Sequence, residues 1–290
     1  MWYSESVTTQ PKRGNTVMKI YAYKNPDSTK EKITAAQARQ AMEYRYGRYL
    51  TDDLAEATLI PVFGGDGTML GALKTLAEFQ KAHPDFDPQR QNVIGLNYGD
   101  IGYYMNRPVQ DLVRLEQKAT RVTVHPLDVR FKTTDGQEHN RFAFNEAIIR
   151  RDSPTEQSCH IEVLSDGQRP VRSIVKGDGL VISTPMGSTA YYRDAYGEPF
   201  PIDSGLIGLQ PICDRDTALR IGGTYPDSQE IRLNVLNGNG KRPAYGNTDN
   251  DERIADVVRC EVKKSTKIAV NLLMNPTCPA WRNRRSYQRV

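Results

Sequence analysis

Five consecutive residues, Gly64-Gly65-Asp66-Gly67-Thr68, combine three glycines with a carboxylate and a hydroxyl. Glycines carry no side chain, so their backbone N–H groups can approach a ligand closely. The short apolar run 57–63 before this loop predicts a buried strand, and the spacing of apolar residues in 68–81 predicts a helix. A helix N-terminus presents backbone N–H groups and the positive end of its dipole, and phosphate groups bind there. The sequence therefore predicts a phosphate-binding loop.

Asp66 is the residue of this loop that could do chemistry. A carboxylate inside a phosphate cradle is electrostatically unfavourable unless it has a role in the reaction. The role we expect is to orient or deprotonate an attacking hydroxyl, as the catalytic base of a kinase does. The loop matches neither the Walker nor the Rossmann pattern. The alternative is that Asp66-Gly67 is only a turn and that Thr68 caps the helix.

A second motif begins at Gly177-Asp178-Gly179 and continues through a strand into the segment 183–191, Ser-Thr-Pro-Met-Gly-Ser-Thr-Ala-Tyr. Its hydroxyl groups could bind ribose and phosphate, and Tyr191 could lie against a base. The alternative is an ordinary junction between a strand and a helix, capped by Ser188 or Thr189.

Three blocks, in this order along the chain, resemble the NAD kinase family. They are Gly64-Gly65-Asp66-Gly67-Thr68, then Asn145-Glu146, then Gly177-Asp178-Gly179-Leu180 continuing to Gly187-Ser188-Thr189-Ala190-Tyr191. The segment 97–103, which begins at Asn97, also resembles the glycine-rich segment of that family. The first block is shared with the diacylglycerol and sphingosine types of lipid kinase, whereas the third is characteristic of the NAD kinases.

The resemblance implies transfer of the terminal phosphate of ATP, or of polyphosphate, to the 2′-hydroxyl of the adenosine ribose of NAD, which gives NADP. Asp66 would be the base, and Gly64, Gly65, Gly67 and Thr68 would bind phosphates. The residues that would bind NAD are Asn97, Asn145, Glu146, Asp178, Thr189, Ala190 and Tyr191, with Asp178 at the nicotinamide end. A divalent cation, Mg²⁺ or Mn²⁺, would be the cofactor, and no metal ligand is identified. The family also implies a homodimer or homotetramer.

Three positions depart from the family pattern. Met186 stands where the family has a small or hydroxyl residue, and a thioether cannot donate a hydrogen bond. Asp194 and Tyr196 replace small residues, and an extra carboxylate near phosphates would repel them. The family also has an acidic residue late in the second domain, and the nearest stretch, 245–249, does not give a confident alignment.

The pattern of elements supports two domains. Strand candidates at 19–22, 57–63 and 93–96 alternate with helix candidates at 35–49 and 68–81, which predicts a parallel sheet with helices on its faces. From about residue 121, apolar and polar residues alternate. Asp135-Gly136, Asp166-Gly167 and the cluster 237–240 look like hairpin turns.

The predicted fold class is therefore a Rossmann-like α/β domain followed by a β-sandwich-like domain. The expected divisions are a flexible segment 1–16, an α/β domain 17–120, a β-rich domain 121–275 that ends on a strand at 268–274, and a basic tail 276–290.

Composition narrows the function classes. The formal charge of +4 is only mildly basic, and the arginine-rich tail has no aromatic interleaving, so nucleic acid is not an expected partner. No apolar run of about 18 residues is present, so no membrane partner is expected. The four cysteines form no CxxC pair, which indicates reduced thiols and a cytoplasmic location.

Two alternatives to an NAD kinase remain at this point. A lipid kinase of the same fold would need an apolar cleft for its lipid acceptor, and the hydroxyl-rich segment 183–191 argues against such a cleft. A non-catalytic, divergent dinucleotide-binding protein would be expected to have lost the Asp66 loop, which is intact here.

Overall fold

The computed structural model describes residues 12–13, 16–24, 32–100, 102–109, 111–153, 155, 157–236, 240–276 and 278–283. Most of the expected flexible segment 1–16, most of the basic tail, and residues 237–239 of an expected turn lie outside the described residues. The chain divides into two compact units. The first comprises Met1–Ala72, Asp85–Val122 and Val270–Arg282, and the second comprises Leu73–Pro84, Thr123–Ala269 and Asn283–Val290.

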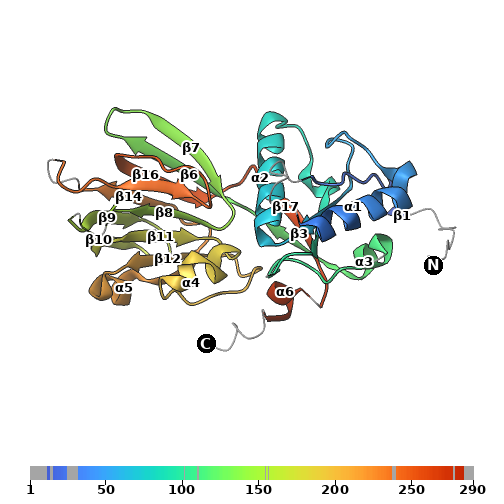
Figure 1. Cartoon of the computed structure of the whole chain (residues 1–290). Coiled ribbons are helices and arrows are strands. Elements are labelled where there is room, and N and C mark those ends of the chain that lie inside the picture. The colour runs from blue at the N-terminus through green and yellow to red at the C-terminus, as the bar shows by residue number, and fades with distance from the viewer. Residues whose placement is uncertain are drawn as a thin grey trace. The chain divides into compact units, whose positions relative to one another are not determined.

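The first unit contains a four-stranded sheet flanked by helices (Figure 1). Its order is β3 (Leu59–Gly64), β4 (Asn92–Asn97), β17 (Val270–Met274) and β5 (Thr120–Val124). β3 and β17 both run parallel to β4. The helical elements are α1 (Ile33–Tyr46), η2 (Gly47–Tyr49), η3 (Pro88–Arg90), α3 (Leu112–Lys118) and α6 (Pro279–Asn283). A short pair, β1 (Lys12–Arg13) and β2 (Thr16–Val17), precedes them.

The apolar strand expected near the end of the chain exists as β17, but it pairs with β4 in the first sheet. All five β17 residues are buried, as expected of a strand covered on both faces. Near the start of the chain, the expected strand at 19–22 is reduced to bridges that Ile20 makes with Leu50 and Leu59.

Helix α2 spans Asp66–Ala82 and begins two residues before the expected start at Thr68. Its first turns belong to the first unit, and its residues from Leu73 onward belong to the second. Apolar residues at helical spacing, Met69, Leu73 and Leu76, are almost fully buried.

The second unit contains two antiparallel sheets. The six-stranded sheet has the order β10 (Val171–Gly177), β9 (Cys159–Ser165), β14 (Ile231–Val235), β16 (Val257–Lys264), β6 (Leu127–Thr133), β7 (Glu138–Ala143). The five-stranded sheet has the order β13 (Gly223–Pro226), β12 (Leu206–Ile212), β11 (Gly179–Ser183), β8 (Glu146–Arg150), β15 (Tyr245–Thr248). The short elements η4 (Gly187–Thr189), α4 (Tyr191–Asp194) and α5 (Arg215–Ile221) complete the unit.

One apolar core joins the two sheets of the second unit, as in a β-sandwich. Strand β6 shows how the sequence specifies this core, because Leu127, Val129 and Phe131 are buried while the residues between them are half-buried or exposed. The expected turns at Asp135-Gly136 and Asp166-Gly167 lie between paired strands, and Gly136 and Gly167 have φ of 85° and 131°. The architecture confirms the predicted fold class.

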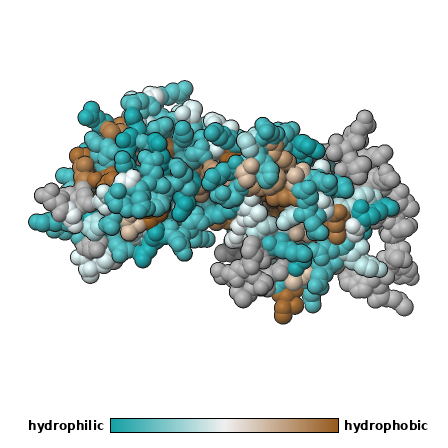
Figure 2. Space-filling model, turned by 90° about the horizontal axis from the view of Figure 1, so that it is seen from above, coloured by the Kyte–Doolittle hydropathy of each residue, from teal (hydrophilic) through white to brown (hydrophobic). Residues whose placement is uncertain are grey.

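The upper face of the β-rich unit is mostly hydrophilic (Figure 2). This agrees with the polar residues that alternate with core residues along β6 and β16. In the described part of the chain, no helix has the length and apolar character needed to cross a bilayer. All four cysteines fall in described residues and are free thiols.

Candidate functional site

The glycine loop joins β3 to α2 in the first unit. The first helical hydrogen bond runs from the N–H of Met69 to the carbonyl of Gly65 at 3.1 Å. The N–H groups of Asp66, Gly67 and Thr68 precede that bond, so they belong to the helix end that has no intrahelical acceptors. A Cβ added to Gly67 would meet no heavy atom within 4 Å, whereas one on Gly64 would lie 2.3 Å from Thr68 Oγ1. Gly64 is therefore needed for packing, and the space beside Gly67 is open.

The carboxylate of Asp66 is held by two backbone groups. Oδ2 accepts the N–H of Tyr103 at 2.8 Å, and Oδ1 accepts the N–H of Tyr104 at 2.9 Å. Burial raises the pKa of Asp66 above its ordinary value, while the bonds from Tyr104 and Tyr103 oppose the rise. A raised pKa makes the ionised carboxylate a stronger base, and the two bonds fix its orientation.

The segment that follows β4 supplies these two donors and packs against the glycine loop. The N–H of Tyr98 donates to the carbonyl of Gly64 at 2.8 Å, and a Cβ on Gly99 would lie 2.8 Å from the Cα of Gly65. The side chain of Asn97 accepts the N–H of Gly99 at 3.0 Å. The structure therefore brings Asn97 beside the Asp66 loop, although its visible contact is with the backbone of its own segment.

In the second unit, Asn145 and Glu146 lie at the start of β8, next to a carboxylate that the sequence did not assign. Oδ1 of Asp249 accepts the N–H groups of Asn145 and Glu146 at 2.8 and 3.2 Å, and Oδ2 accepts that of Phe144 at 3.1 Å. Asp249 has a positive φ of 48°, which Asp tolerates better than most residues. The acid late in the second domain thus supports the Asn145-Glu146 backbone.

Lys74, from the part of α2 that belongs to the second unit, faces the same group of acids. Its Nζ lies 3.7 Å from Asp249 Oδ2 and 2.5 Å from Asp251 Oδ1. Nothing in the sequence motifs pointed to Lys74. The one indication of Lys74 in the sequence was its position, six residues after Thr68 on a predicted helix.

Burial, together with the charges of Asp249 and Asp194, raises the pKa of Glu146 to about 8. Burial raises the pKa of Asp249 as well, but Lys74 and the three backbone donors oppose that rise. The pair therefore keeps its proton on Glu146 at neutral pH. Oε2 of Glu146 is buried and has no hydrogen-bond partner in the described part of the chain. A buried polar atom without a partner is uncommon and points to a ligand or water.

The hydroxyl groups of the third block have a different use from the one expected. Ser183, Thr184 and Ser188 are almost fully buried and donate to backbone carbonyls: Thr184 to Phe144 at 2.5 Å and Ser188 to Pro185 at 2.8 Å. These side chains shape the loop and do not line a surface for ribose or phosphate. Among the serines and threonines of this stretch, Thr189 is the one that is partly exposed.

The two adjacent tyrosines of the block are distinguished by burial. Tyr192 is fully buried and packs edge-on against Phe200, with ring centroids 5.9 Å apart, and burial raises its pKa to about 12. Tyr191 is partly exposed, and its hydroxyl accepts a hydrogen bond from Arg150 at 3.1 Å. Of the two, Tyr191 is the one that is partly exposed, as is Ala190 before it.

Asp178 lies between β10 and β11, flanked by two glycines. Its carboxylate pairs with Arg151 at 2.6 Å, and its N–H donates to the carbonyl of Ile212 at 2.8 Å. A Cβ on Gly179 would lie 2.2 Å from the carbonyl oxygen of Ile149, so this turn requires glycine. These contacts are those of a tight turn, and no contact of Asp178 tests its expected role at the nicotinamide end.

The three residues that depart from the family pattern differ in burial. Met186 is 4% exposed, so its thioether is a packing group. Asp194 ends α4 and Tyr196 follows it. Both side chains are exposed, and Tyr196 has a φ of 65°.

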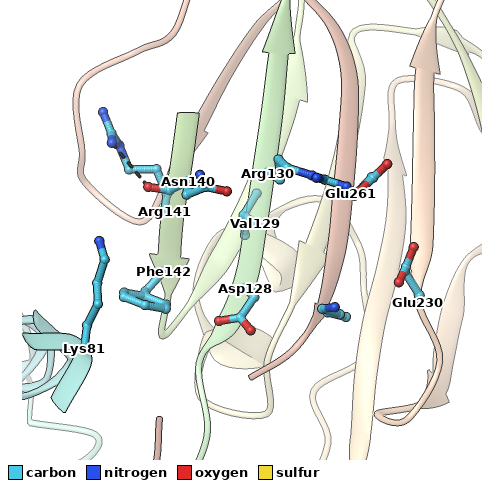
Figure 3. Close-up of a pocket in the computed structure, with 10 residues that line it drawn as sticks. Lys81, Asp128, Val129, Arg130, Asn140, Arg141, Phe142, Glu230 and Glu261 are labelled. Carbon is cyan, nitrogen blue, oxygen red and sulfur yellow. Dashed lines mark hydrogen bonds and ion pairs between the residues drawn. The ribbon is translucent and has the colours of Figure 1, made fainter. Parts of the chain in front are cut away.

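A shallow hollow of about 320 Å³ lies elsewhere, on the outer face of β6, β7 and β16 (Figure 3). Its lining mixes cations and anions. Arg130 forms an ion pair with Glu261, and Lys81 lies 5.5 Å from the centre of the Phe142 ring. None of the motif residues line it. We therefore do not assign it to the reaction.

The described residues include no group of three or more histidine, cysteine or acidic side chains that could hold a metal ion. Mg²⁺ is commonly bound by one or two carboxylates together with the phosphates of a nucleotide, so a cation that arrives with ATP needs no such cage.

No protein-family model matches the chain. The NAD kinase of Xylella fastidiosa strain Temecula1 is 32% identical over 243 residues, which cover 84% of this chain and 88% of the relative. The NAD kinase of Rhizorhabdus wittichii is 34% identical over 245 residues, which cover 84% of this chain and 90% of the relative. The chain belongs to the NAD kinase family. This membership confirms the family and the enzyme class that the three blocks predicted.

Two solved structures of the NAD kinase family share the fold. Yeast NADH kinase complexed with NADH aligns with a TM-score of 0.69 at 18% identity, covering 94% of this chain and 87% of that chain. An NAD kinase from Archaeoglobus fulgidus in complex with ATP aligns with a TM-score of 0.62 at 18% identity, covering 94% and 99%. At this identity, the likeness shows the fold of the two units.

Proposed function

We propose that this member of the NAD kinase family transfers the terminal phosphate of ATP to the 2′-hydroxyl of the adenosine ribose of NAD, giving NADP. The observation that carries the proposal is the geometry of Asp66. A carboxylate with a raised pKa is held by two backbone N–H groups at the end of a glycine loop with open space beside Gly67. Such a group can take the proton of an attacking hydroxyl while the loop binds the phosphate that is transferred.

The phosphate side of the site is assigned to the first unit. The N–H groups at the start of α2 would donate to phosphate oxygens, and the positive end of the helix dipole would favour their charge. Gly64 and Gly65 keep the loop close to the segment after β4, and Thr68 packs against Gly64. A divalent cation carried by the phosphates would neutralise their charge. Polyphosphate presents the same groups and is the alternative donor.

The acceptor side is assigned to the second unit. Glu146 carries a proton at neutral pH and has an oxygen without a partner among the described residues. A protonated carboxyl can both donate to and accept from a ribose hydroxyl. Asn145 is held next to it by the Asp249 carboxylate, and Thr189, Ala190 and Tyr191 form a partly exposed stretch at the start of α4. Asp178 and Asn97 complete the proposed NAD contacts.

A homodimer or homotetramer and a cytoplasmic location are parts of the same proposal. The family resemblance supports the oligomeric state, and the free thiols at all four cysteines support the location.

The test is NADP formation from NAD and ATP with Mg²⁺ by the purified protein, compared with Asp66→Asn. We expect turnover to fall by roughly 10²- to 10⁴-fold in the variant, the usual contribution of a general base, with nucleotide binding retained. Asp52→Asn, an exposed carboxylate of the first unit, is the matched control and should keep full activity. Near-full turnover by Asp66→Asn would contradict the assigned base, and no NADP from the unaltered protein would contradict the proposed function.

A further inference from the structure

Cys278 lies just before helix α6, in the last part of the chain that the structure describes, and it has no part in the steps given so far. Its side chain is fully buried. Burial, with a further contribution from the charge of Asp66, raises the pKa of its thiol to about 11. The thiol is therefore a neutral S–H group at neutral pH, and it lies close enough to Asp66 to be affected by its charge.

Two donors at the start of α6 bind one carbonyl oxygen of the segment that follows β4. The S–H of Cys278 donates to the carbonyl of Tyr103 at 3.4 Å, and the N–H of Ala280 donates to the same oxygen at 2.9 Å. Cys278 and Tyr103 are 175 positions apart in the chain. The start of α6 therefore binds a residue whose own N–H group holds Asp66.

The bound carbonyl belongs to a peptide group that donates to Asp66. The carbonyl of Tyr103 and the N–H of Tyr104 are the two sides of one planar peptide. This N–H donates to Oδ1 of Asp66 at 2.9 Å. Hydrogen bonds to a carbonyl polarise its peptide and strengthen donation by the N–H on the other side. Cys278 and Ala280 thus orient the peptide and strengthen its bond to the carboxylate.

The same two segments are joined a second time at Asn106, whose side chain is fully buried. Its Oδ1 accepts the N–H of Asn275 at 2.9 Å, and its amide group donates to the carbonyls of Gly95 and Leu273 at 3.1 and 2.9 Å. The carbonyl of Asn275 in turn accepts the N–H of Cys278 at 3.0 Å. The segment that leads to α6 is therefore anchored to β4 and β17, which gives Cys278 a fixed place.

The thiol also occupies the N-cap position of α6, where a side chain can accept N–H groups of the first helical turn. Hydrogen bonds from the N–H groups of Trp281 and Ala280 oppose the rise in the pKa of Cys278. The sulfur is thus an acceptor for α6 while its hydrogen is donated to Tyr103. A serine hydroxyl has the same donor and acceptor capacity, so serine is the conservative replacement at this position.

We propose that Cys278 and the first turn of α6 position the catalytic carboxylate of Asp66 through the peptide between Tyr103 and Tyr104, an inference that rests on the proposed role of Asp66 as base. Cys278 is a positioning residue, since it acts on Asp66 only through that peptide. Its loss should lower kcat. KM should not change, because the contacts of the phosphate loop with the segment 98–99 do not involve α6.

The first experiment compares the unaltered protein with three variants of Cys278. Cys278→Ala and Cys278→Val remove the donor and the acceptor, and valine also fills most of the space, whereas Cys278→Ser keeps both groups. We expect kcat to fall roughly tenfold or more in the alanine and valine variants, since misplacing a reacting group by about 1 Å can cost about 10²-fold. KM for NAD and for ATP should stay unchanged, and Cys278→Ser should restore most of kcat.

The pH profile separates positioning from a loss of stability. Burial raises the pKa of Asp66, and the N–H groups of Tyr104 and Tyr103 lower it. Weaker donation by these groups should raise it further, so the acidic limb of kcat/KM should move to higher pH in Cys278→Ala and Cys278→Val. Cys278→Ser should keep the limb in place. The thiol itself remains protonated throughout the acidic limb, because its pKa is about 11.

Two control variants remove buried groups elsewhere. Cys260→Ala removes a buried thiol of the second unit, and Asn271→Ala removes a buried amide of the first unit that donates to the carbonyls of Pro88 and Gln91. Both should leave kcat and the acidic limb unchanged. If Cys278→Ala and Cys278→Val leave them unchanged in an active enzyme, or if Asn271→Ala changes them equally, the inference is overturned while the proposed function stands.

Amide NMR of the unaltered protein tests the link without kinase activity. Between about pH 4 and pH 8, ionisation of Asp66 should shift the amide proton of Tyr104, to which it is bonded. The amide proton of Ala280 should shift with the same midpoint, because Ala280 is bonded to the other side of that peptide. If it does so although no NADP is formed, the proposed function fails and the link between α6 and Asp66 stands. An Ala280 amide proton that does not shift overturns the inference.

Discussion

Oδ1 of Asp249 accepts the backbone N–H of Glu146 at 3.2 Å, and the charge of Asp249 acts on the carboxyl group of Glu146 in the second unit. Asp249 is 5% exposed and Glu146 is 7% exposed. Two buried carboxylates cannot both be ionised without a large electrostatic cost, and the protein divides the charge between them. Asp249 has three N–H donors and Lys74 nearby, whereas Glu146 has an unpartnered oxygen, so the proton resides on Glu146.

Replacing Asp249 by Asn tests this arrangement. The amide keeps one acceptor but loses the charge, so we expect the pKa of Glu146 to fall and the backbone of Phe144–Glu146 to be held less well. Loss of charged hydrogen-bond acceptors at a buried site costs about 1–3 kcal/mol in the free energy of unfolding. Urea unfolding measures the stability, and carboxyl ¹³C chemical shifts measure the pKa. Asp251→Asn is the control, because Asp251 touches Lys74 but not the Asn145-Glu146 backbone.

Glu146→Gln should change how stability depends on pH. Because the pKa of Glu146 is about 8 in the folded protein and about 4.5 ordinarily, the folded state binds one more proton than the unfolded state between these values. Its contribution to the free energy of unfolding is fully present below about pH 4.5 and is lost as pH rises to about 8.

We therefore expect the unaltered protein to lose stability, on the order of a few kcal/mol at most, between pH 5 and 8 by comparison with Glu146→Gln. Urea unfolding at several pH values gives the two curves, with Glu252→Gln, an exposed residue, as control. Parallel curves for the unaltered protein and Glu146→Gln would mean that Glu146 is ionised in the folded state.

The two acids also predict the shape of the pH–rate profile. Asp66 must be ionised to act as base, and its raised pKa places the acidic limb of kcat/KM above the ordinary value of 3.8. Glu146 acts in its protonated form, so kcat/KM should fall again as pH passes about 8. Measuring kcat/KM for NAD between pH 4 and 10 gives a bell-shaped curve if both assignments hold.

Glu146→Gln separates the two limbs, because glutamine does not titrate but keeps a donor and an acceptor. The variant should retain the acidic limb and lose the basic one. A basic limb that persists in Glu146→Gln would assign it to another group, and a profile without an acidic limb would argue against Asp66 as the base.

The glycine loop and the other two family blocks could be recognised from the sequence because each is a short run of neighbouring residues. Asp249 could not be assigned, because its partner Glu146 is 103 positions away and the two meet only through the pairing of β15 with β8. Lys74 was missed for the same reason, since its contact with Asp251 spans 177 positions.

It was equally hard to predict which of two adjacent residues of the same type is buried. The sequence alone could not decide between Tyr191 and Tyr192. A Cβ on Gly197 or Gly208 would lie within 2.6 Å of the Tyr192 ring, so glycines five and sixteen positions along the chain leave the space that the buried ring fills. Ser188 was expected to be free for a ligand or a cap, but it bonds to the backbone of Pro185 and Phe200. Pattern and propensity do not encode such contacts.

Two glycines of the phosphate loop give a last prediction, because they differ in the space around them. A Cβ on Gly64 would lie 2.3 Å from Thr68 Oγ1, whereas one on Gly67 would meet nothing within 4 Å. Gly64→Ala should therefore lower the free energy of unfolding by about 1–3 kcal/mol, the cost of forcing the loop and helix apart. Gly67 lies inside α2, so Gly67→Ala should keep stability or raise it by up to about 1 kcal/mol.

Gly67→Ala should impair the use of ATP although it leaves the stability of the fold unchanged or raises it. If phosphate oxygens approach the backbone of Gly67, its new methyl group would occupy their space, and KM for ATP should rise although the protein remains folded. Urea unfolding and ATP kinetics on Gly64→Ala, Gly67→Ala and Gly47→Ala make the comparison. Gly47 is a control with open space around it and an α-helical φ of −43°. An unchanged KM for ATP in Gly67→Ala would show that the donor phosphates bind away from the first turn of α2.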